Sequence, residues 1–176
     1  MKRCKLFIIA SLLFLCTQFT FGQTNPPIQE DSLSYHLYMK KSLVLVSGYH
    51  LHQHHFGEIG IGIMNDGIVG HHPSTTVYEL SNELKFSQDF VWGLKTGAWI
   101  GGGVAGMNMG FNLINYTDFK ENTLRFRPEI GMGFGIFRLV YGYNLTLTNK
   151  GFKGINTHNF GLNIMPALKT IKETKL

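Results

Sequence analysis

Apolar and polar residues alternate one by one over long stretches of this chain. Between residues 123 and 134 the apolar series is Leu124, Phe126, Pro128, Ile130, Met132 and Phe134, and the residues between them are charged, polar or glycine. Successive side chains of a β-strand point to opposite faces, whereas an α-helix repeats roughly every 3.6 residues. The alternation therefore predicts a β-strand with one apolar face and one polar face.

The same alternation recurs through most of the chain, and no useful length of sequence shows a helical period. It is clearest from Phe137 to Thr148, and it is also present from Ala105 to Leu113 and from Phe160 to Ile164. We predict about eight strands, at about residues 43–52, 54–65, 76–87, 91–101, 104–116, 123–135, 137–149 and 157–168. The predicted fold class is all-β, an antiparallel up-and-down barrel.

The direction in which the apolar face points distinguishes a membrane barrel from a soluble one. The predicted strands at 104–116, 123–135 and 137–149 exceed the usual length of roughly 5–6 residues and match the roughly 9–11 residues that cross a bilayer. Aromatic residues tend to fall at predicted strand ends, as in the girdles of membrane barrels; they are Tyr49, Tyr78, Trp92, Tyr116, Phe119, Tyr141 and Phe160. We therefore predict a transmembrane barrel whose apolar face contacts lipid.

The polar faces of the predicted strands carry charges of both signs, interspersed with glycines. A barrel of about eight strands encloses only enough space for side chains, so these groups are predicted to pair inside the lumen, where glycines leave room for long side chains. The predicted lumen charge network comprises Glu58, Glu79, Glu83, Lys95, Arg125, Arg127, Glu129 and Arg138. We expect a plugged lumen rather than an open pore.

The N-terminus has the composition of a secretory signal peptide. Basic residues among the first five precede an apolar run from Leu6 to Leu15, which is too short for a spanning helix of roughly 20 residues. Cleavage is predicted before Gln23; a lipoprotein at Cys16 is disfavoured because bulky residues precede that cysteine. The predicted organisation is a signal peptide at 1–22, a periplasmic N-terminal leader at 23–41, the barrel at 42–168 and a solvated C-terminal tail at 169–176.

Removal of the signal changes both the thiol content and the charge of the chain. Both cysteines, Cys4 and Cys16, lie inside the signal, which excludes disulfides, cysteine-bound zinc and thiol catalysis in the mature protein. The signal also holds 3 of the 16 basic residues, which leaves 13 basic residues against 11 acidic ones. Three of the 13 lie in the C-terminal tail, namely Lys169, Lys172 and Lys175. No basic patch remains that would indicate a nucleic-acid partner.

Three sequence features resemble a known group of proteins. The signal junction is Gly22-Gln23, residues 124–131 read Leu-Arg-Phe-Arg-Pro-Glu-Ile-Gly, and residues 141–144 read Tyr-Gly-Tyr-Asn. With the alternation over about residues 43–168, the chain resembles the small outer-membrane barrels of Gram-negative bacteria, OmpA/OmpX-like in the broad sense. The resemblance implies a barrel in the cell outer membrane, both termini in the periplasm, and outer-membrane lipid and the barrel-insertion machinery as partners.

Some features depart from that group. Such barrels commonly end in an aromatic residue that the insertion machinery reads, whereas this chain continues past Leu168; either the insertion signal lies inside the chain, around residues 160–164, or insertion is in doubt. The connection 66–75 is long for the end of the barrel where turns are short, which leaves the strand count in residues 42–90 open by one. Pro128 lacks an N–H and predicts an irregularity near a rim.

Two motifs could indicate bound ions or cofactors. His50, His52 and His54 occupy alternate positions on one predicted strand face and are candidates for Zn²⁺, Cu²⁺ or Ni²⁺ binding, with a polar loop rim as the competing interpretation. Gly101 to Gly106 fits the GxGxxG pattern of dinucleotide sites, but no helix follows, which favours a glycine-rich hairpin. We predict no cofactor and no dedicated metal site.

No distinctive catalytic motif is present. Candidate groups are the acids Glu79, Glu83 and Glu129 and a hydrolytic pair of Ser81 or Ser87 with His158, all of which a lumen network or solvated loops explain better. We expect a non-enzymatic integral outer-membrane protein that acts structurally or through its loops, with an unknown ligand. The alternatives are a lipid-modifying barrel enzyme and a soluble periplasmic or secreted barrel that binds an apolar ligand and turns the row from Leu124 to Phe134 inward.

Overall fold

The structure is a computed structural model that describes residues 38–69, 72–87, 89–103, 106–134 and 136–175. The predicted signal peptide and the predicted leader up to residue 37 lie outside these residues. The described chain forms the strands β1 (Tyr38–Leu51), β2 (His55–Val69), β3 (His72–Lys85), β4 (Trp92–Gly102), β5 (Met107–Thr117), β6 (Asn122–Phe134), β7 (Phe137–Tyr143), β8 (Leu145–Thr146), β9 (His158–Ile164) and β10 (Ala167–Lys175). Within the described ranges, no helix has the length and hydropathy needed to cross a membrane.

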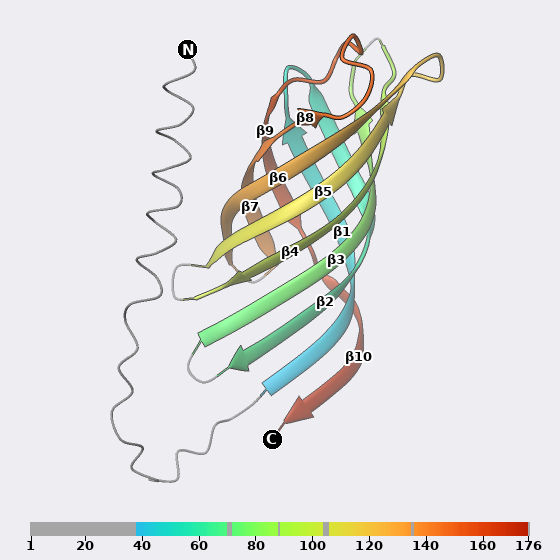
Figure 1. The fold of residues 1–176 in the computed structure, drawn as a ribbon. Coiled ribbons are helices and arrows are strands. Elements are labelled where there is room, and N and C mark those ends of the chain that lie inside the picture. The colour runs from blue at the N-terminus through green and yellow to red at the C-terminus, as the bar shows by residue number, and fades with distance from the viewer. Residues whose placement is uncertain (1–37, 70–71, 88, 104–105, 135, 176) are drawn as a thin grey trace, which may run out of the picture. The chain divides into compact units, whose positions relative to one another are not determined.

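The strands form one antiparallel sheet that closes on itself (Figure 1). Each strand from β1 to β6 pairs with the next one in sequence, β7 pairs with β9, and residues 160–164 of β9 pair with residues 47–51 of β1. The short β8 follows β7 and pairs with β6. The predicted antiparallel barrel of eight strands is therefore confirmed among the described residues.

The connections distinguish the two ends of the barrel. At the end that we call the loop end, residues 52–54, 86–91, 118–121 and 147–157 join the strands; at the other, the turn end, the gaps between strands are only a few residues long. The predicted long connection 66–75 is mostly strand, because β2 continues to Val69 and β3 begins at His72. Gly103 and Gly106 have φ angles of 76° and 60°, and the Gly106 N–H donates to the Gly103 carbonyl, so the GxGxxG segment makes a hairpin turn.

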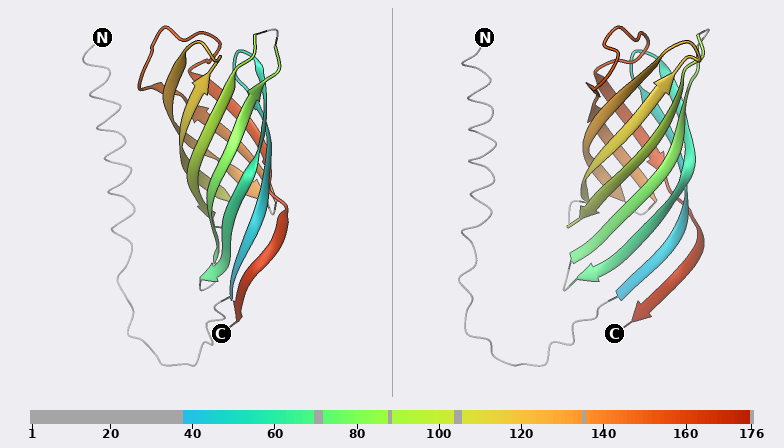
Figure 2. Two further views of the ribbon diagram at one scale, coloured as in Figure 1. Left: turned by 90° about the vertical axis from the view of Figure 1, so that its right-hand side faces the viewer. Right: turned by 45° about the vertical axis from the view of Figure 1, so that its right-hand side comes forward.

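β10 extends the sheet beyond the closed barrel. It pairs with residues 38–44 of β1, and the Pro166 carbonyl between β9 and β10 accepts a hydrogen bond from the Leu45 N–H at 3.0 Å. Figures 1 and 2 show β10 beside the first half of β1, below the closed part of the barrel at the turn end. Residues 169–175, predicted as part of a solvated tail, are thus in a strand, and among the described residues the sheet already includes residues 38–41, which were predicted as leader.

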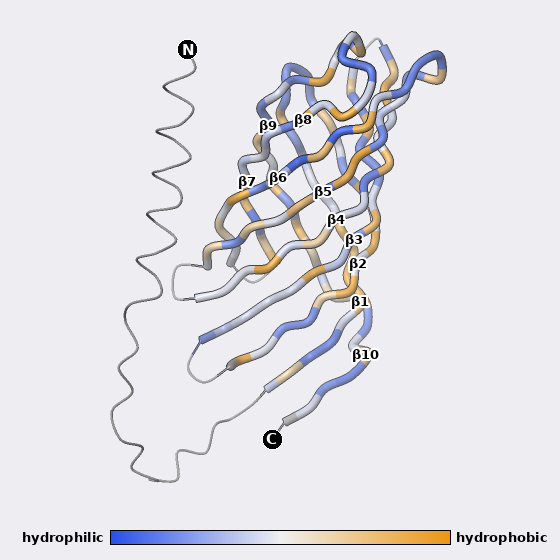
Figure 3. Tube along the Cα trace, in the orientation of Figure 1, coloured by the Kyte–Doolittle hydropathy of each residue, from blue (hydrophilic) through white to orange (hydrophobic). Residues whose placement is uncertain are grey.

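Hydrophobic and hydrophilic residues alternate along the strands (Figure 3), and exposure alternates with them, since the polar positions are buried in the lumen. On β6, Ile130 and Met132 are 52% and 47% exposed, whereas Arg127 and Glu129 are 0% and 4% exposed. The apolar row of this strand therefore points away from the lumen. The irregularity predicted at Pro128 occurs beside it, in the middle of the wall rather than at a rim: β7 ends at Tyr143 and β8 resumes at Leu145.

Candidate functional site

The lumen is filled by three successive layers of side chains. The middle layer is charged. On its turn-end side lies an apolar cluster of Val44, Val46, Met64, Val77, Trp99 and Met165. On its loop-end side lies a second cluster of Phe56, Val91, Ile114, Tyr116, Phe152 and Ile155. The order follows from the strands themselves; β2, for example, places Phe56, Glu58 and Met64 in sequence on its inner face.

Lys95 joins the carboxylates of two neighbouring strands. Its Nζ lies 2.5 Å from Glu58 Oε1, 2.9 Å from Glu79 Oε1 and 4.0 Å from Glu83 Oε1, and all these side chains are fully buried. Glu58 is held further by Ser81 Oγ, which donates to its Oε1 at 2.5 Å, and by Asn163 Nδ2, which donates to its Oε2 at 2.7 Å. A buried charge is tolerated only with such partners.

Arg127 forms the second centre of the charged layer. Its Nη1 and Nη2 donate to the two carboxylate oxygens of Glu83 at 2.7 and 3.1 Å, its Nη2 also donates to Tyr116 Oη at 2.5 Å, and its Nε donates to Asn144 Oδ1 at 2.7 Å. The Tyr116 hydroxyl in turn donates to Glu83. This planar, bidentate arrangement is the strongest type of side-chain ion pair.

Glu129 links Arg127 to the last member of the layer, Arg138. Arg138 Nη2 lies 3.0 Å from Glu129 Oε2, and Arg127 Nη1 lies 3.8 Å from Glu129 Oε1. The Arg138 guanidinium also lies 4.8 Å from the centroid of the Trp99 ring, a cation–π contact that joins the charged layer to the turn-end apolar cluster.

The structure therefore brings seven of the eight predicted network residues together: Glu58, Glu79, Glu83, Lys95, Arg127, Glu129 and Arg138. The eighth, Arg125, is buried on the same face of β6 but donates to Thr146 Oγ1 at 2.6 Å and forms no ion pair within the described ranges. Within the described ion-pair network, four carboxylates therefore face three cations, Lys95, Arg127 and Arg138, while Arg125 and Lys85 are buried outside it. Glycines make room for the long side chains, since a Cβ at Gly142 would lie 2.8 Å from Arg127 Cδ.

The histidines take part in this network rather than forming a site of their own. His50 Nε2 lies 2.6 Å from Glu58 Oε2, and His52 Nε2 lies 3.4 Å from Arg127 Nη2. His54 is only partly buried and lies in the turn between β1 and β2. Burial, reinforced by the charge of Arg127, lowers the pKa of His52 to about 3, so this imidazole is neutral at physiological pH.

One group in the described chain has the spacing of metal ligands. The nearest ligand atoms of His50, Glu58 and Glu83 lie within 4.8 Å of one another. Lys95 and Arg127 already bind these two carboxylates, so a cation would enter a site whose charge is neutralised. The geometry therefore fits an ion-pair network better than a metal site, and it does not combine His50, His52 and His54 as a ligand set.

Ser81 and His158, considered as a hydrolytic pair, form hydrogen bonds with other partners and not with each other. Ser81 is buried and bonded to Glu58, whereas His158 accepts or donates a hydrogen bond with the Tyr141 hydroxyl at 2.7 Å on the exposed surface. Ser87 is exposed in the connection between β3 and β4. No hydrogen bond joins a serine to a histidine within the part of the chain that the structure describes.

The loop end is closed by the connection between β8 and β9. This segment, residues 147–157, places Phe152 and Ile155 inside the barrel mouth, where they are 7% and 9% exposed. A polar hollow of about 730 Å³ remains above them. Asp118 at its rim accepts from the backbone N–H groups of Glu121 and Lys120 at 2.7 and 2.9 Å, and these bonds hold the pKa of this carboxyl below its usual value.

The sequence alone did not identify Tyr116, Asn144 and Asn163 as members of the charged layer. Asn144 and Asn163 lie at inward positions of the alternation, so their burial was predictable. Tyr116, predicted to lie in the outward aromatic girdle, is instead fully buried, because it shares the inward face of β5 with Asn112 and Ile114. The partners in the charged layer were not predictable, because closure of the barrel brings distant parts of the sequence into contact. Arg127 and its partner Glu83 are 44 positions apart, and Asn163 and its partner Glu58 are 105 positions apart. Comparisons with protein families, with curated proteins and with solved structures give no match for this chain.

Proposed function

We propose that this protein is an integral outer-membrane barrel with a sealed lumen, which acts structurally or through its loops rather than as an enzyme or a pore. The observation that carries the proposal is the inverted distribution of side chains. Charged groups fill the lumen, and large apolar side chains from every wall strand face outward at roughly half exposure, among them Ile59, Leu80, Ile100, Phe111, Ile130, Leu139 and Leu162. Soluble monomers rarely expose continuous apolar surface of this kind, and lipid is the solvent that suits it.

The dimensions and the aromatic residues also support a membrane setting. Strands β1 to β6 have 11 to 15 residues, enough for the roughly 9–11 that span a bilayer. Exposed rings gather towards the loop end: Phe90 stacks on Phe119 with centroids 5.6 Å apart, and Trp92 lies 6.5 Å from Phe119. Aromatic rings at this level are typical of the girdle at a membrane surface.

The filled lumen supports a sealed barrel. A solute that passed through would have to displace Phe152 and Ile155, separate the ion pairs of Lys95 and Arg127, and pass the apolar cluster around Trp99. Separation of a buried pair costs about 3–5 kcal/mol. In a planar lipid bilayer we therefore expect no stepwise conductance, and stable open channels would contradict the sealed lumen.

The location is tested by cell fractionation of the protein, followed by electrophoresis of unheated and boiled samples. We expect recovery with the outer membrane and a mobility that changes on boiling, because a folded barrel resists detergent until it is heated. A protein that stays in the soluble fraction with unchanged mobility would favour the alternative of a soluble barrel.

Single arginines test the lipid-facing row directly. Ile130→Arg places a charge on the outer face at mid-strand, where we expect the free energy of unfolding to fall by about 2–4 kcal/mol in lipid vesicles. Leu124→Arg is the matched control, because Leu124 lies on the same face two residues from the start of β6, near the interface, where the cost is about 0–1 kcal/mol. Equal costs at the two depths would contradict the membrane assignment.

A further inference from the structure

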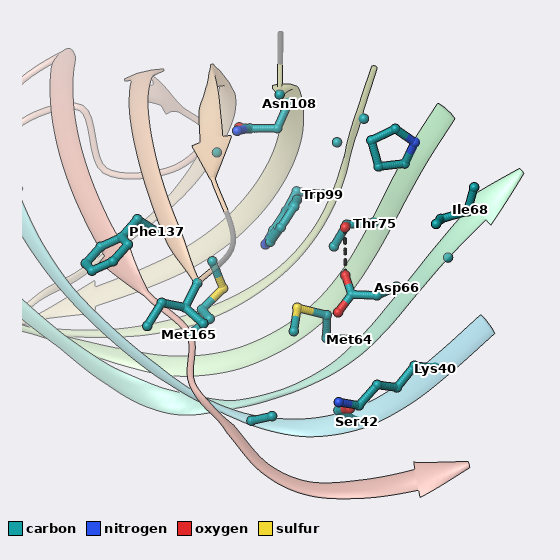
Figure 4. A pocket seen from close by; sticks show the side chains of 18 of the residues that line it. Lys40, Ser42, Met64, Asp66, Ile68, Thr75, Trp99, Asn108, Phe137 and Met165 are labelled. Carbon is teal, nitrogen blue, oxygen red and sulfur yellow. Dashed lines mark hydrogen bonds between the residues drawn. The ribbon is translucent and has the colours of Figure 1, made fainter. Parts of the chain in front are cut away.

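The turn end holds an open pocket of about 640 Å³, a size in the range of small-molecule sites. Figure 4 shows it between the inner faces of the extended strands and the end of the barrel. Its wall is built in rows that the strand register defines. The deepest row is Ser42, Met64 and Trp99, and the next row towards the mouth is Lys40, Asp66, Thr75, Gly101 and Asn108.

Glycines on β4 and in the following turn create the hollow. Gly101, Gly102, Gly103 and Gly106 line the pocket, so this part of the wall has no side chains beyond Trp99. A Cβ at Gly101 would lie 3.0 Å from Asn108 Cβ and 3.4 Å from the Trp99 ring. The glycine-rich segment that resembled a dinucleotide motif in the sequence therefore keeps a space open beside Trp99.

Two residues that line this pocket each hold a buried polar atom with no hydrogen-bond partner among the described residues. Trp99 Nε1 and Ser42 Oγ are both buried, in residues that are 9% and 1% exposed. The indole N–H can only donate, so it requires an acceptor. Asp66, the only carboxylate that lines the pocket within the described chain, accepts from Thr75 Oγ1 at 2.7 Å.

We propose that this pocket binds a single-chain amphiphile whose head group is a carboxylate. The head would accept from the buried donors of the deep row, and Lys40 adds a cation on the same face of β1, two residues nearer the mouth. Met64 and Met165, which lie beside the pocket in Figure 4, supply apolar surface for the chain. The inference rests on the end of the barrel alone and holds whether or not the wall lies in lipid.

The indole N–H of Trp99 reports on such a ligand directly. The chain has two tryptophans, and Trp92 Nε1 already donates to Asn82 Oδ1 at 2.9 Å, so Trp92 serves as an internal control. We would titrate octanoate into the full protein, labelled with ¹⁵N-tryptophan and held in detergent-free lipid nanodiscs, with Trp92→Phe to assign the two signals. A saturable downfield shift of the Trp99 indole proton at about millimolar octanoate, without a shift of Trp92, is the expected result.

Matched variants and a second probe sharpen the test. Thr75→Phe fills the pocket and should weaken octanoate binding at least about tenfold, whereas Thr76→Phe places the same ring on the opposite face of β3 and should leave binding unchanged. Octylammonium has the same chain with a donor head and should not shift the indole proton downfield.

The other outcomes overturn the proposal. An absence of any saturable shift would mean that the pocket holds only water. Equal responses to octanoate and octylammonium would mean that no acceptor is recognised. Should Thr75→Phe fail to fold, nuclear Overhauser contacts between the octanoate chain and the methyl groups of Met64 and Met165 provide the decisive measurement, and their absence would count against the site.

Discussion

Replacement of Arg127 by methionine tests whether the charged layer stabilises the barrel as a unit. The guanidinium is fully buried and donates to Glu83, Tyr116 and Asn144, so the variant leaves the Glu83 carboxylate buried with its main partner gone. The nearest remaining cation, Lys95, lies 4.0 Å away and already binds Glu58 and Glu79 more closely. Breaking a buried pair from one side costs about 3–5 kcal/mol, and we expect a loss in that range.

The matched control is Arg125→Met, two residues away on the same face of the same strand. Arg125 forms one side-chain hydrogen bond, to Thr146, and no ion pair in the described chain, so its loss should cost about 1 kcal/mol. A double variant, Arg127→Met with Glu83→Leu, removes both charges and should be more stable than Arg127→Met alone, since no unpaired carboxylate remains.

The assay is equilibrium unfolding in urea, with the protein in lipid vesicles at neutral pH and tryptophan fluorescence as the readout. With Glu83→Leu added as the second single variant, the free energies of unfolding of the wild type, Arg127→Met, Glu83→Leu and the double variant form a cycle that isolates the Arg127–Glu83 term, and Arg125→Met is a control outside that cycle. Equal losses for Arg127→Met and Arg125→Met would refute the reasoning, as would a double variant that is less stable than Arg127→Met by the full cost of a second substitution.

Two further predictions follow from the lumen. Burial lowers the pKa of His52 to about 3, so below pH 6.5, the ordinary pKa of a histidine, unfolding of the protein takes up a proton at this residue. The stability that His52 contributes is therefore fully present above pH 6.5 and is lost as the pH falls towards 3. Between about pH 7 and about pH 5 the wild type should lose about 2 kcal/mol by urea unfolding and His52→Asn should lose less, with equal losses contradicting the assignment. Gly142→Leu forces a side chain against the Arg127 stem and should cost about 1–3 kcal/mol in the same assay, whereas Gly151→Ala, whose Cβ meets only Asn149 Oδ1 at 3.6 Å, should change stability by less than about 0.5 kcal/mol.

The period of the sequence predicted the barrel and the orientation of its side chains well. A period of two assigns each residue to a face before any partner is known, so Glu58, Lys95 and Arg127 could be placed on the polar faces from the sequence alone. The location of a strand end requires more than the period. At the turn end the inward positions of the strands are polar, as at Lys40, Asp66 and Thr75, and several of their outward neighbours are polar too. A segment that is polar on both faces resembles a loop in the sequence.

Partners and interruptions depend on closure of the sheet, which the local sequence does not contain. Pro128 indicated an irregularity, but only the fold shows that the break lies at Asn144 on the neighbouring strand, where the side chain binds Arg127 Nε. His50 and His52 were candidate metal ligands because histidines at alternate positions of a strand share one face and could bind the same ion. In the barrel, Glu58 and Asn163 from other strands surround His50 and give it a different set of contacts.

The filled lumen also limits where this protein can act. The charged layer lies between two apolar clusters, so both its acids and its cations are withdrawn from water and from any solute. A group that binds or reacts must be reachable. Among the inward-facing polar groups of the described residues, the reachable ones lie near the two ends: the rim around Asp118 and residues 147–157 at the loop end, and the pocket beside Trp99 at the turn end. Trp99 contacts both the charged layer and the pocket, since its ring lies against the Arg138 guanidinium and the residue also lines the pocket. A ligand in the pocket would contact Trp99, and Trp99 contacts Arg138, which pairs with Glu129; we therefore expect octanoate binding to change the stability of the charged layer through this pair.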